Sequence, residues 1–211
     1  MYGHELVKSQ NYLKMLLDIC PELETSKPGN LSSARLPSLK HVICIAKENC
    51  HHATIPFGQI ESFGDSRTRN TLNELSRKIQ ASDPINIQYT SGTTGNPKAC
   101  VLSHHMILNN ILQVGRLVKF NENKPVICLP VPLYHCFGMV LGSLATVTYG
   151  STAVYPGTIY NPTNTLKVIM SEKCTAVYGT PTMYIDLLIH PRLKEFNVSS
   201  LNTAIMSGST W

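Results

Sequence analysis

Apolar residues follow two different spacings along this chain, and the two alternate from residue 85 onward. Short stretches that are apolar throughout or at every second residue predict strands at 85–89, 126–131, 152–155, 175–178 and 201–206. Longer stretches with apolar residues at helical spacing predict helices that begin after Ser103, at Met139, at Pro162 and at Pro181. This alternation predicts an α/β fold, in which a parallel sheet is flanked by helices.

Before residue 85 the pattern predicts fewer regular elements. Residues 4–17 carry leucines near one face and polar residues elsewhere, which predicts an amphipathic helix that Pro21 ends. Val42–Ala46 is short and β-branched and predicts a buried strand, and 68–80 has the spacing of a surface helix. The intervening stretches, 21–38 and 47–64, predict loops.

A loop rich in hydroxyls and glycines follows the strand at 85–89. It reads Thr90-Ser91-Gly92-Thr93-Thr94-Gly95-Asn96-Pro97-Lys98. Glycines permit tight turns, and backbone N–H groups, hydroxyls and one ammonium together suit phosphate oxygens. A plain surface turn is the alternative, but a turn needs neither four hydroxyls nor a lysine. The loop is not of the Walker type, because Pro97 precedes Lys98 and Ala99 follows it. It also lacks the third glycine of a dinucleotide-binding loop.

Composition excludes some function classes. The net charge is +5 and the pI is near 8.8, but the basic residues are scattered, so no nucleic-acid surface is indicated. No run of 18 apolar residues appears, so we expect no membrane span. Seven cysteines without a C-x-x-C pair predict neither a disulfide framework nor a zinc site, and they favour a reducing compartment. We interpret Cys50-His51-His52 as a solvated loop rather than a metal site.

A histidine lies at the end of the predicted strand 126–131. It belongs to Pro132-Leu133-Tyr134-His135-Cys136-Phe137-Gly138, and from these residues alone a hydrogen-bonded core histidine is the simpler interpretation. Gly179-Thr180 and Ser207-Gly208-Ser209 end two further strands. Ligands of parallel sheets bind at the carboxyl ends of strands, so we expect these segments and the hydroxyl-rich loop on one rim.

Two of these motifs resemble those of a known superfamily. The loop Thr90–Lys98 resembles the phosphate loop of the adenylate-forming enzymes, which include acyl-CoA synthetases, luciferases and the adenylation domains of peptide synthetases. Residues 132–138 resemble the histidine-gate motif of acyl-CoA synthetases, and 83–88 and 178–183 resemble segments of mitochondrial medium-chain fatty acyl-CoA ligases. Ala99 departs from the superfamily, which usually has glycine after the lysine.

The resemblance implies a two-step ligase of fatty acid metabolism. A fatty acid attacks the α-phosphate of Mg·ATP to give acyl-adenylate and pyrophosphate, and coenzyme A then displaces AMP. The loop would bind ATP through Thr90, Ser91, Gly92, Thr93, Thr94, Gly95, Asn96, Pro97 and Lys98. Lys98 and His135 would be catalytic. The substrate would contact His135, Gly138, Gly179, Thr180, Ser207, Gly208 and Ser209. No resident metal site is expected.

The resemblance also sets expectations for the extent of the chain. Residues 1–211 would form part of the large N-terminal domain of an adenylate-forming enzyme, with a core subdomain at 83–211 and no C-terminal domain. The superfamily's Tyr-Gly-x-Thr-Glu segment and its late lysine would lie beyond Trp211, so we expect a fragment that does not catalyse ligation alone. The alternative is a short product that binds a nucleotide or a partner without catalysis. A mitochondrial location follows from the resemblance only, since no transit peptide is visible.

Overall fold

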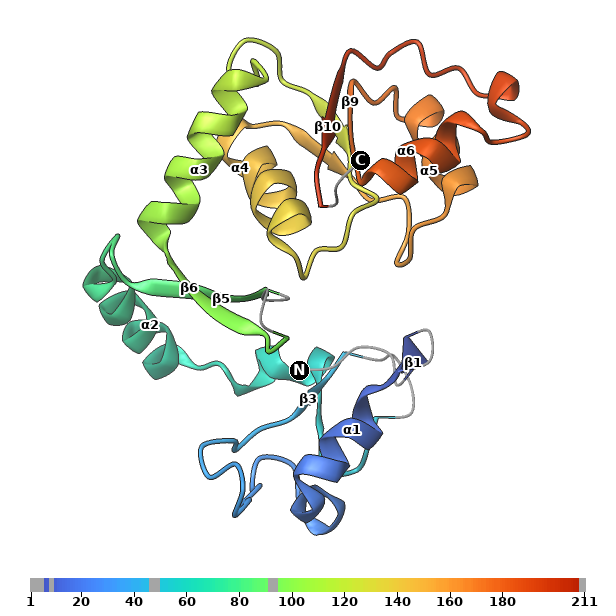
Figure 1. The fold of residues 1–211 in the computed structure, drawn as a ribbon. Helices are drawn as coiled ribbons and strands as arrows, with labels where there is room; N and C mark the ends of the chain where they lie inside the picture. Colours follow the sequence, from blue (N-terminus) through green and yellow to red (C-terminus); the bar gives the residue numbers. More distant parts are fainter. Residues whose placement is uncertain (1–5, 8–9, 46–49, 91–94, 209–211) are drawn as a thin grey trace. The chain divides into compact units, whose positions relative to one another are not determined.

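The computed structural model describes residues 6–7, 10–45, 50–90 and 95–208 (Figure 1). The chain divides into two compact units, residues 1–79 and 80–211. The second unit carries the motifs singled out above, and its fold is given first.

A four-stranded parallel sheet forms the centre of the second unit, with strand order β10-β9-β7-β8. Its strands are β7 (Val126–Cys128), β8 (Thr152–Val154), β9 (Ala176–Gly179) and β10 (Thr203–Met206). Helices α5 (Pro162–Ser171) and α6 (Pro181–Leu188) connect strands of this sheet. The predicted parallel sheet with helices is therefore confirmed, and the strands at 152–155, 175–178 and 201–206 are each found within two residues of their predicted bounds.

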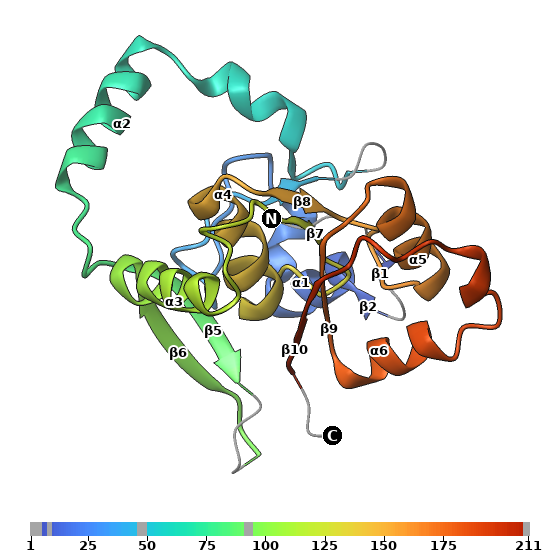
Figure 2. The same cartoon turned by 90° about the horizontal axis from the view of Figure 1, so that it is seen from above.

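Both faces of this sheet are buried. Successive side chains of a strand point to opposite faces, so neighbouring residues belong to different clusters. Ile127 and Tyr178 pack with Phe137 on one face. Cys128 and Val177 pack with Ile169 of α5 on the other. Figure 2 shows α5 and α6 on one side of the sheet and α3 and α4 on the other. Central strands buried on both faces are typical of parallel sheets, and they explain why β9 is apolar throughout.

A helical segment follows β7 and covers the first face. It begins as a π-helix, η3 (Phe137–Leu144), and continues as α4 (Ala145–Tyr149), so the single helix predicted from Met139 starts earlier and is wider at first. Gly142 lets η3 pack closely against Leu129, the residue after β7, because a Cβ at Gly142 would lie 2.8 Å from Cδ2 of Leu129. Gly150 ends α4 at φ +61°.

The strand at 85–89 does not belong to the parallel sheet, so this part of the prediction was wrong. β5 (Pro84–Thr90) pairs antiparallel with β6 (Lys98–Ser103) in a separate two-stranded sheet. The pattern missed β6 because helix α3 (His104–Leu117) begins directly after it. Residues 91–97 are also too few for a crossover between parallel strands, but they suffice to connect a hairpin.

Helix α3 is fixed at its start by the ends of this hairpin. Its N-cap Ser103 accepts a hydrogen bond from the N–H of Met106 at 3.3 Å. The N–H groups of His104 and His105 donate to the carbonyl oxygens of Asp83 and Ala81 at 3.3 and 2.8 Å. Three of the otherwise unpaired N–H groups of the first turn are thereby satisfied.

Within its described residues, the first unit contains two α-helices, two 3-10 helices and two two-stranded sheets. Helix α1 (Tyr12–Ile19) is capped by Asn11, and α2 (Ser66–Lys78) is capped by Asp65. The remaining elements are β1 (Leu6–Val7), β2 (Gln10–Asn11), η1 (Pro21–Thr25), β3 (Ile43–Cys44), β4 (Ile55–Pro56) and η2 (Phe57–Phe63). The predicted helix at 4–17 was wrong in its start, because Leu6 lies in a strand and Asn11 provides the cap.

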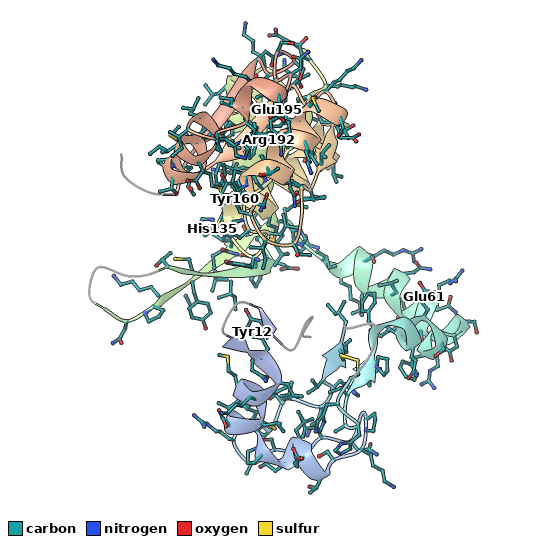
Figure 3. The ribbon with its side chains drawn as sticks, turned by 90° about the vertical axis from the view of Figure 1, so that its right-hand side faces the viewer. Tyr12, Glu61, His135, Tyr160, Arg192 and Glu195 are labelled. Atoms are coloured by element: carbon teal, nitrogen blue, oxygen red, sulfur yellow. A yellow bond between two sulfur atoms is a disulfide. The ribbon has the colours of Figure 1, made fainter. Side chains whose placement is uncertain are left out.

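A disulfide joins Cys44 to Cys50 in the first unit, and Figure 3 shows it as a yellow bond. The cysteine count did not predict it, since an odd number without C-x-x-C gives no hint of one pair six residues apart. Cys44 is buried in the unit's core with Cys20, Leu23 and Val42. Within the described ranges no group of three metal-ligating side chains occurs, and no helix there has the length and apolarity to span a membrane.

Candidate functional site

The hairpin β5–β6 carries the predicted phosphate loop. Thr90, the last residue of β5, pairs with Lys98, the first residue of β6, so the two form the base of the loop. Both side chains are exposed, as are Asn96 and Pro97. Ser91, Gly92, Thr93 and Thr94 lie outside the described residues. The structure thus places the lysine and one hydroxyl, both exposed, at the base of the loop.

Gly95 has a backbone requirement that no other residue type meets without strain. Its φ is +89°, and a Cβ built there would have no atom within 4 Å. The space around Gly95 is open, so its backbone conformation and not crowding accounts for the glycine.

His135 follows β7 in a tight turn and its ring is held by its own backbone neighbourhood. The N–H of Phe137 donates to Nδ1 of His135 at 3.1 Å, and the N–H of His135 donates to the carbonyl of Pro132 at 3.3 Å. With Nδ1 accepting, the neutral ring carries its proton on Nε2. His135 is exposed, and Figure 3 labels it in the second unit. The interpretation as a buried core histidine is therefore wrong, and Nε2–H is available as a donor.

Gly138 is required by packing against the turn that holds His135. A Cβ at Gly138 would lie 2.4 Å from the carbonyl oxygen of Pro132 and 3.1 Å from that of Val131. The first turn of η3 therefore lies directly against the strand exit. Gly138 contributes to the site by letting this approach happen.

The carboxyl ends of β9 and β10 lie together, and four predicted site residues meet there. The N–H of Ser207 donates to the carbonyl of Gly179 at 3.2 Å. Gly208 has φ +97°, and a Cβ there would lie 3.3 Å from Cγ2 of Thr180. Thr180 caps α6 by accepting from the N–H of Met183 at 3.4 Å. We call Gly179, Thr180, Ser207 and Gly208 the strand-end rim; Ser209 lies outside the described residues.

Tyr184 supports this rim and was not predicted from the sequence. Its hydroxyl lies 2.8 Å from the carbonyl oxygen of Val177 on β9 and 3.1 Å from that of Ile205 on β10. Burial raises the pKa of Tyr184 to about 12, so the hydroxyl stays protonated and donates at neutral pH. A signal was present, because Tyr184 lies one turn after the cap Thr180 and so on the helix face that covers the strands.

The phosphate loop and the strand-end rim belong to different sheets, so the expected single rim of four segments was wrong. The hairpin instead reaches η3 through Asn86, whose Nδ2 lies 4.0 Å from Sδ of Met139, and through Leu102, which packs in the same cluster. Oδ1 of Asn86 is buried and has no hydrogen-bond partner among the described residues. Met139 is four residues from His135, and its N–H donates to the carbonyl of His135 at 3.0 Å. The hairpin thus contacts the segment that bears His135.

These features define a class: an α/β protein with a parallel sheet and a separate hairpin that carries a loop rich in glycine and hydroxyl residues. The family model of the AMP-binding enzymes matches residues 13–211. The chain belongs to the AMP-binding enzyme family, which confirms the superfamily assigned from the loop.

The curated relatives that the chain resembles include acyl-CoA ligases and synthetases. The chain is 47% identical over 203 residues to the mitochondrial medium-chain acyl-CoA ligase ACSF2 of Danio rerio and 39% identical over 208 residues to that of Homo sapiens. Each match covers 96% of this chain and 33% of the relative. A putative acyl-CoA synthetase of Bacillus subtilis, YngI, is 37% identical, with 36% of its length covered. The chain therefore spans about a third of the length of the curated relatives it matches.

Solved structures show the same fold. An ATP-bound RpMatB-BxBclM chimera is 30% identical with a TM-score of 0.55, covering 62% of this chain and 25% of that protein. The red-emitting luciferase of Phrixothrix hirtus is 24% identical with a TM-score of 0.63, covering 81% of this chain and 33% of that one. The predicted fold class, part of an adenylate-forming enzyme, is confirmed.

Proposed function

We propose that this chain supplies the phosphate-binding and carboxylate-binding parts of an AMP-forming acyl-CoA ligase that activates a medium-chain fatty acid. The observation that carries the proposal is the loop Thr90–Lys98 at the end of a hairpin, with Lys98 paired to Thr90 at its mouth. The identity to acyl-CoA ligases across 96% of the chain supports the substrate class. In this proposal residues 1–211 are part of the large N-terminal domain, and 83–211 form its core subdomain.

The first step forms a carboxylic–phosphoric anhydride. A carboxylate oxygen of the fatty acid attacks the α-phosphorus of Mg·ATP, the new P–O bond forms, and the bond from the α-phosphorus to the bridging oxygen breaks. Pyrophosphate leaves with the electron pair of that bond. The hydroxyl of Thr90 and the N–H groups of the loop would hold the β- and γ-phosphates, and the ammonium of Lys98 would offset charge on the leaving group.

His135 would act at the carboxylate end as a hydrogen-bond donor. Phe137 occupies Nδ1, so Nε2–H is the group that can reach an oxygen of the acid or of the α-phosphate. A donor fixed before the reaction stabilises developing negative charge without having to reorient. The strand-end rim would border the same substrate from β9 and β10.

The second step would transfer the acyl group to coenzyme A. The thiolate attacks the acyl carbon of the adenylate, the bond from that carbon to the phosphate oxygen breaks, and AMP leaves. Coenzyme A and the fatty acid enter as substrates, and a mitochondrial location is proposed because the ACSF2 relatives are named as mitochondrial.

The test is ATP–pyrophosphate exchange by the protein made from the complete reading frame that contains this chain. We expect octanoate to stimulate exchange, short acids such as acetate to stimulate it less, and Lys98→Ala to abolish most of it. Exchange that is independent of any carboxylic acid would contradict the proposal.

The second candidate is a nucleotide-binding protein without catalysis. The exposure of Thr90 and Lys98 at the base of the loop favours it, because ATP can bind there whether or not an acid follows. Protection against heat by ATP, without exchange for any acid of two to sixteen carbons, would identify this function.

A further inference from the structure

Tyr184 joins the two strands that end at the rim. It projects from α6, and its hydroxyl proton is shared between the carbonyl oxygens of Val177 on β9 and Ile205 on β10. These strands run parallel, and their register pairs Tyr178 with Ile205 and Gly179 with Met206. The hydroxyl thus contacts both strands just before the point at which they leave the sheet.

The ring of Tyr184 also sets the position of the first rim residue. A Cβ at Gly179 would lie 3.0 Å from Cε2 and 3.3 Å from Cδ2 of this ring. The backbone of Gly179 therefore packs directly against the ring of Tyr184. This packing explains why position 179 is a glycine, without any ligand. The next residue, Thr180, caps the helix that carries Tyr184, so ring, cap and strand end form one connected unit.

We propose that Tyr184 is a positioning residue, whose hydroxyl holds Ser207 and Gly208 against Gly179 and Thr180 so that the rim meets the substrate in one geometry. The inference rests on the proposed function, because the rim is taken to border the fatty acid. β10 has only β9 as a strand neighbour among the described residues, so its register depends on that one ladder and on side chains such as Tyr184.

The hydroxyl of Tyr184 supports the last hydrogen bond between the two strand ends, the rung that joins Ser207 to Gly179. The N–H of Ser207 donates to the carbonyl of Gly179 at 3.2 Å. Gly208 follows with φ +97° and has no side chain that could add a further contact. A bridge from Tyr184 to Ile205, two residues before Ser207, restrains this rung. Without the bridge the rung would open more often, and the rim would spend less time in its binding geometry.

The test compares Tyr184→Phe with Tyr149→Phe in the protein from the complete reading frame. Both variants keep the ring and lose one hydroxyl, and Tyr149 is a matched control because its hydroxyl donates to the carbonyl of Leu112 at 2.8 Å, between α4 and α3. Two quantities are measured: hydrogen exchange of the Ser207 amide, and KM and kcat for octanoate in ATP–pyrophosphate exchange.

We expect Tyr184→Phe to speed exchange of the Ser207 amide about two- to tenfold and to raise KM for octanoate, with kcat changed less. Tyr149→Phe should change neither quantity. Unchanged exchange at Ser207 in Tyr184→Phe would overturn the inference, and so would faster exchange with an unchanged KM. A parent protein without octanoate-dependent activity would overturn the proposed function instead, and the exchange at Ser207 would still decide the role of the hydroxyl.

Discussion

The N–H of Phe137 donates a hydrogen bond to Nδ1 of His135 at 3.1 Å, and this contact determines which ring nitrogen can serve a substrate. Because Nδ1 accepts, the neutral ring has its proton on Nε2. Protonation of Nδ1 would place two N–H groups opposite each other and break the contact. In the proposed function His135 would therefore act through Nε2–H as a hydrogen-bond donor.

Substitutions at His135 test this assignment through the position of the donor. The amide nitrogen of glutamine reaches about as far from the backbone as Nε2, and that of asparagine reaches about as far as Nδ1. We expect His135→Asn to lower the rate of octanoate-dependent pyrophosphate exchange by about 100-fold, the usual effect of losing one transition-state donor. His135→Gln should retain about tenfold more activity than His135→Asn. Equal losses in the two variants would show that Nε2–H is not the acting group.

Lys98 should matter for catalysis and little for folding. Its side chain is exposed at the start of β6, so Lys98→Ala should change the free energy of unfolding by less than about 0.5 kcal/mol. Pyrophosphate exchange should fall by at least about 100-fold, because in the proposed function the lysine offsets charge on the leaving group. Lys98→Arg keeps the charge and should recover part of the rate. A large drop in melting temperature in Lys98→Ala would instead indicate a structural role.

Gly138→Ala should destabilise the second unit by overpacking. The new methyl group would lie 2.4 Å from the carbonyl oxygen of Pro132, so backbone must move, at a cost of about 1–3 kcal/mol. Gly157→Ala is the control in the same unit, because its nearest atom is 3.4 Å away and its φ is not positive. Urea unfolding of the two variants measures the difference. Equal stabilities would contradict the close approach of η3 to the turn before it.

Buried tyrosines predict a loss of stability at alkaline pH. The pKa of Tyr184 is raised by burial to about 12, and that of Tyr160 is raised to about 12 by burial and then by Asp186. A raised pKa in the folded state means that the stabilisation is present below the unfolded value near 10 and is lost as pH rises toward 12. The free energy of unfolding should therefore fall between about pH 10 and 12. Tyr184→Phe should show a shallower fall, and an identical slope would contradict the burial of this hydroxyl.

Much of the fold was predictable because strands and helices of the second unit have distinct periods and clear caps. Asn161 and Thr180 cap α5 and α6, each followed by a proline in the first turn, and both helices begin where the sequence placed them. β6 was missed because six residues between a loop and a helix cap carry too little pattern to separate a strand from a loop. The consequence was an error in topology, since β5 was assigned to the parallel sheet.

The candidate site residues that can be named from the sequence are those in consecutive motifs, and their roles stay predictions. The loop Thr90–Lys98 and the turn around His135 are recognisable from consecutive residues. The structure places the ends of the loop on the hairpin β5–β6 and the turn after β7. Contacts between distant residues were not predictable. No local pattern pairs Tyr184 with Ile205, which is 21 residues away. Such contacts arise from tertiary packing, which a single sequence does not encode in any short window.

Formation of the acyl-adenylate tests the central claim most directly. The protein from the complete reading frame is mixed with Mg·ATP and octanoate in the absence of coenzyme A, quenched, and analysed for octanoyl-AMP and pyrophosphate by mass spectrometry. The account predicts that both products appear in equal amounts, that Lys98→Ala suppresses both, and that added coenzyme A converts the adenylate to octanoyl-CoA and AMP. ADP and phosphate as products, or ATP bound without any adenylate, would contradict it.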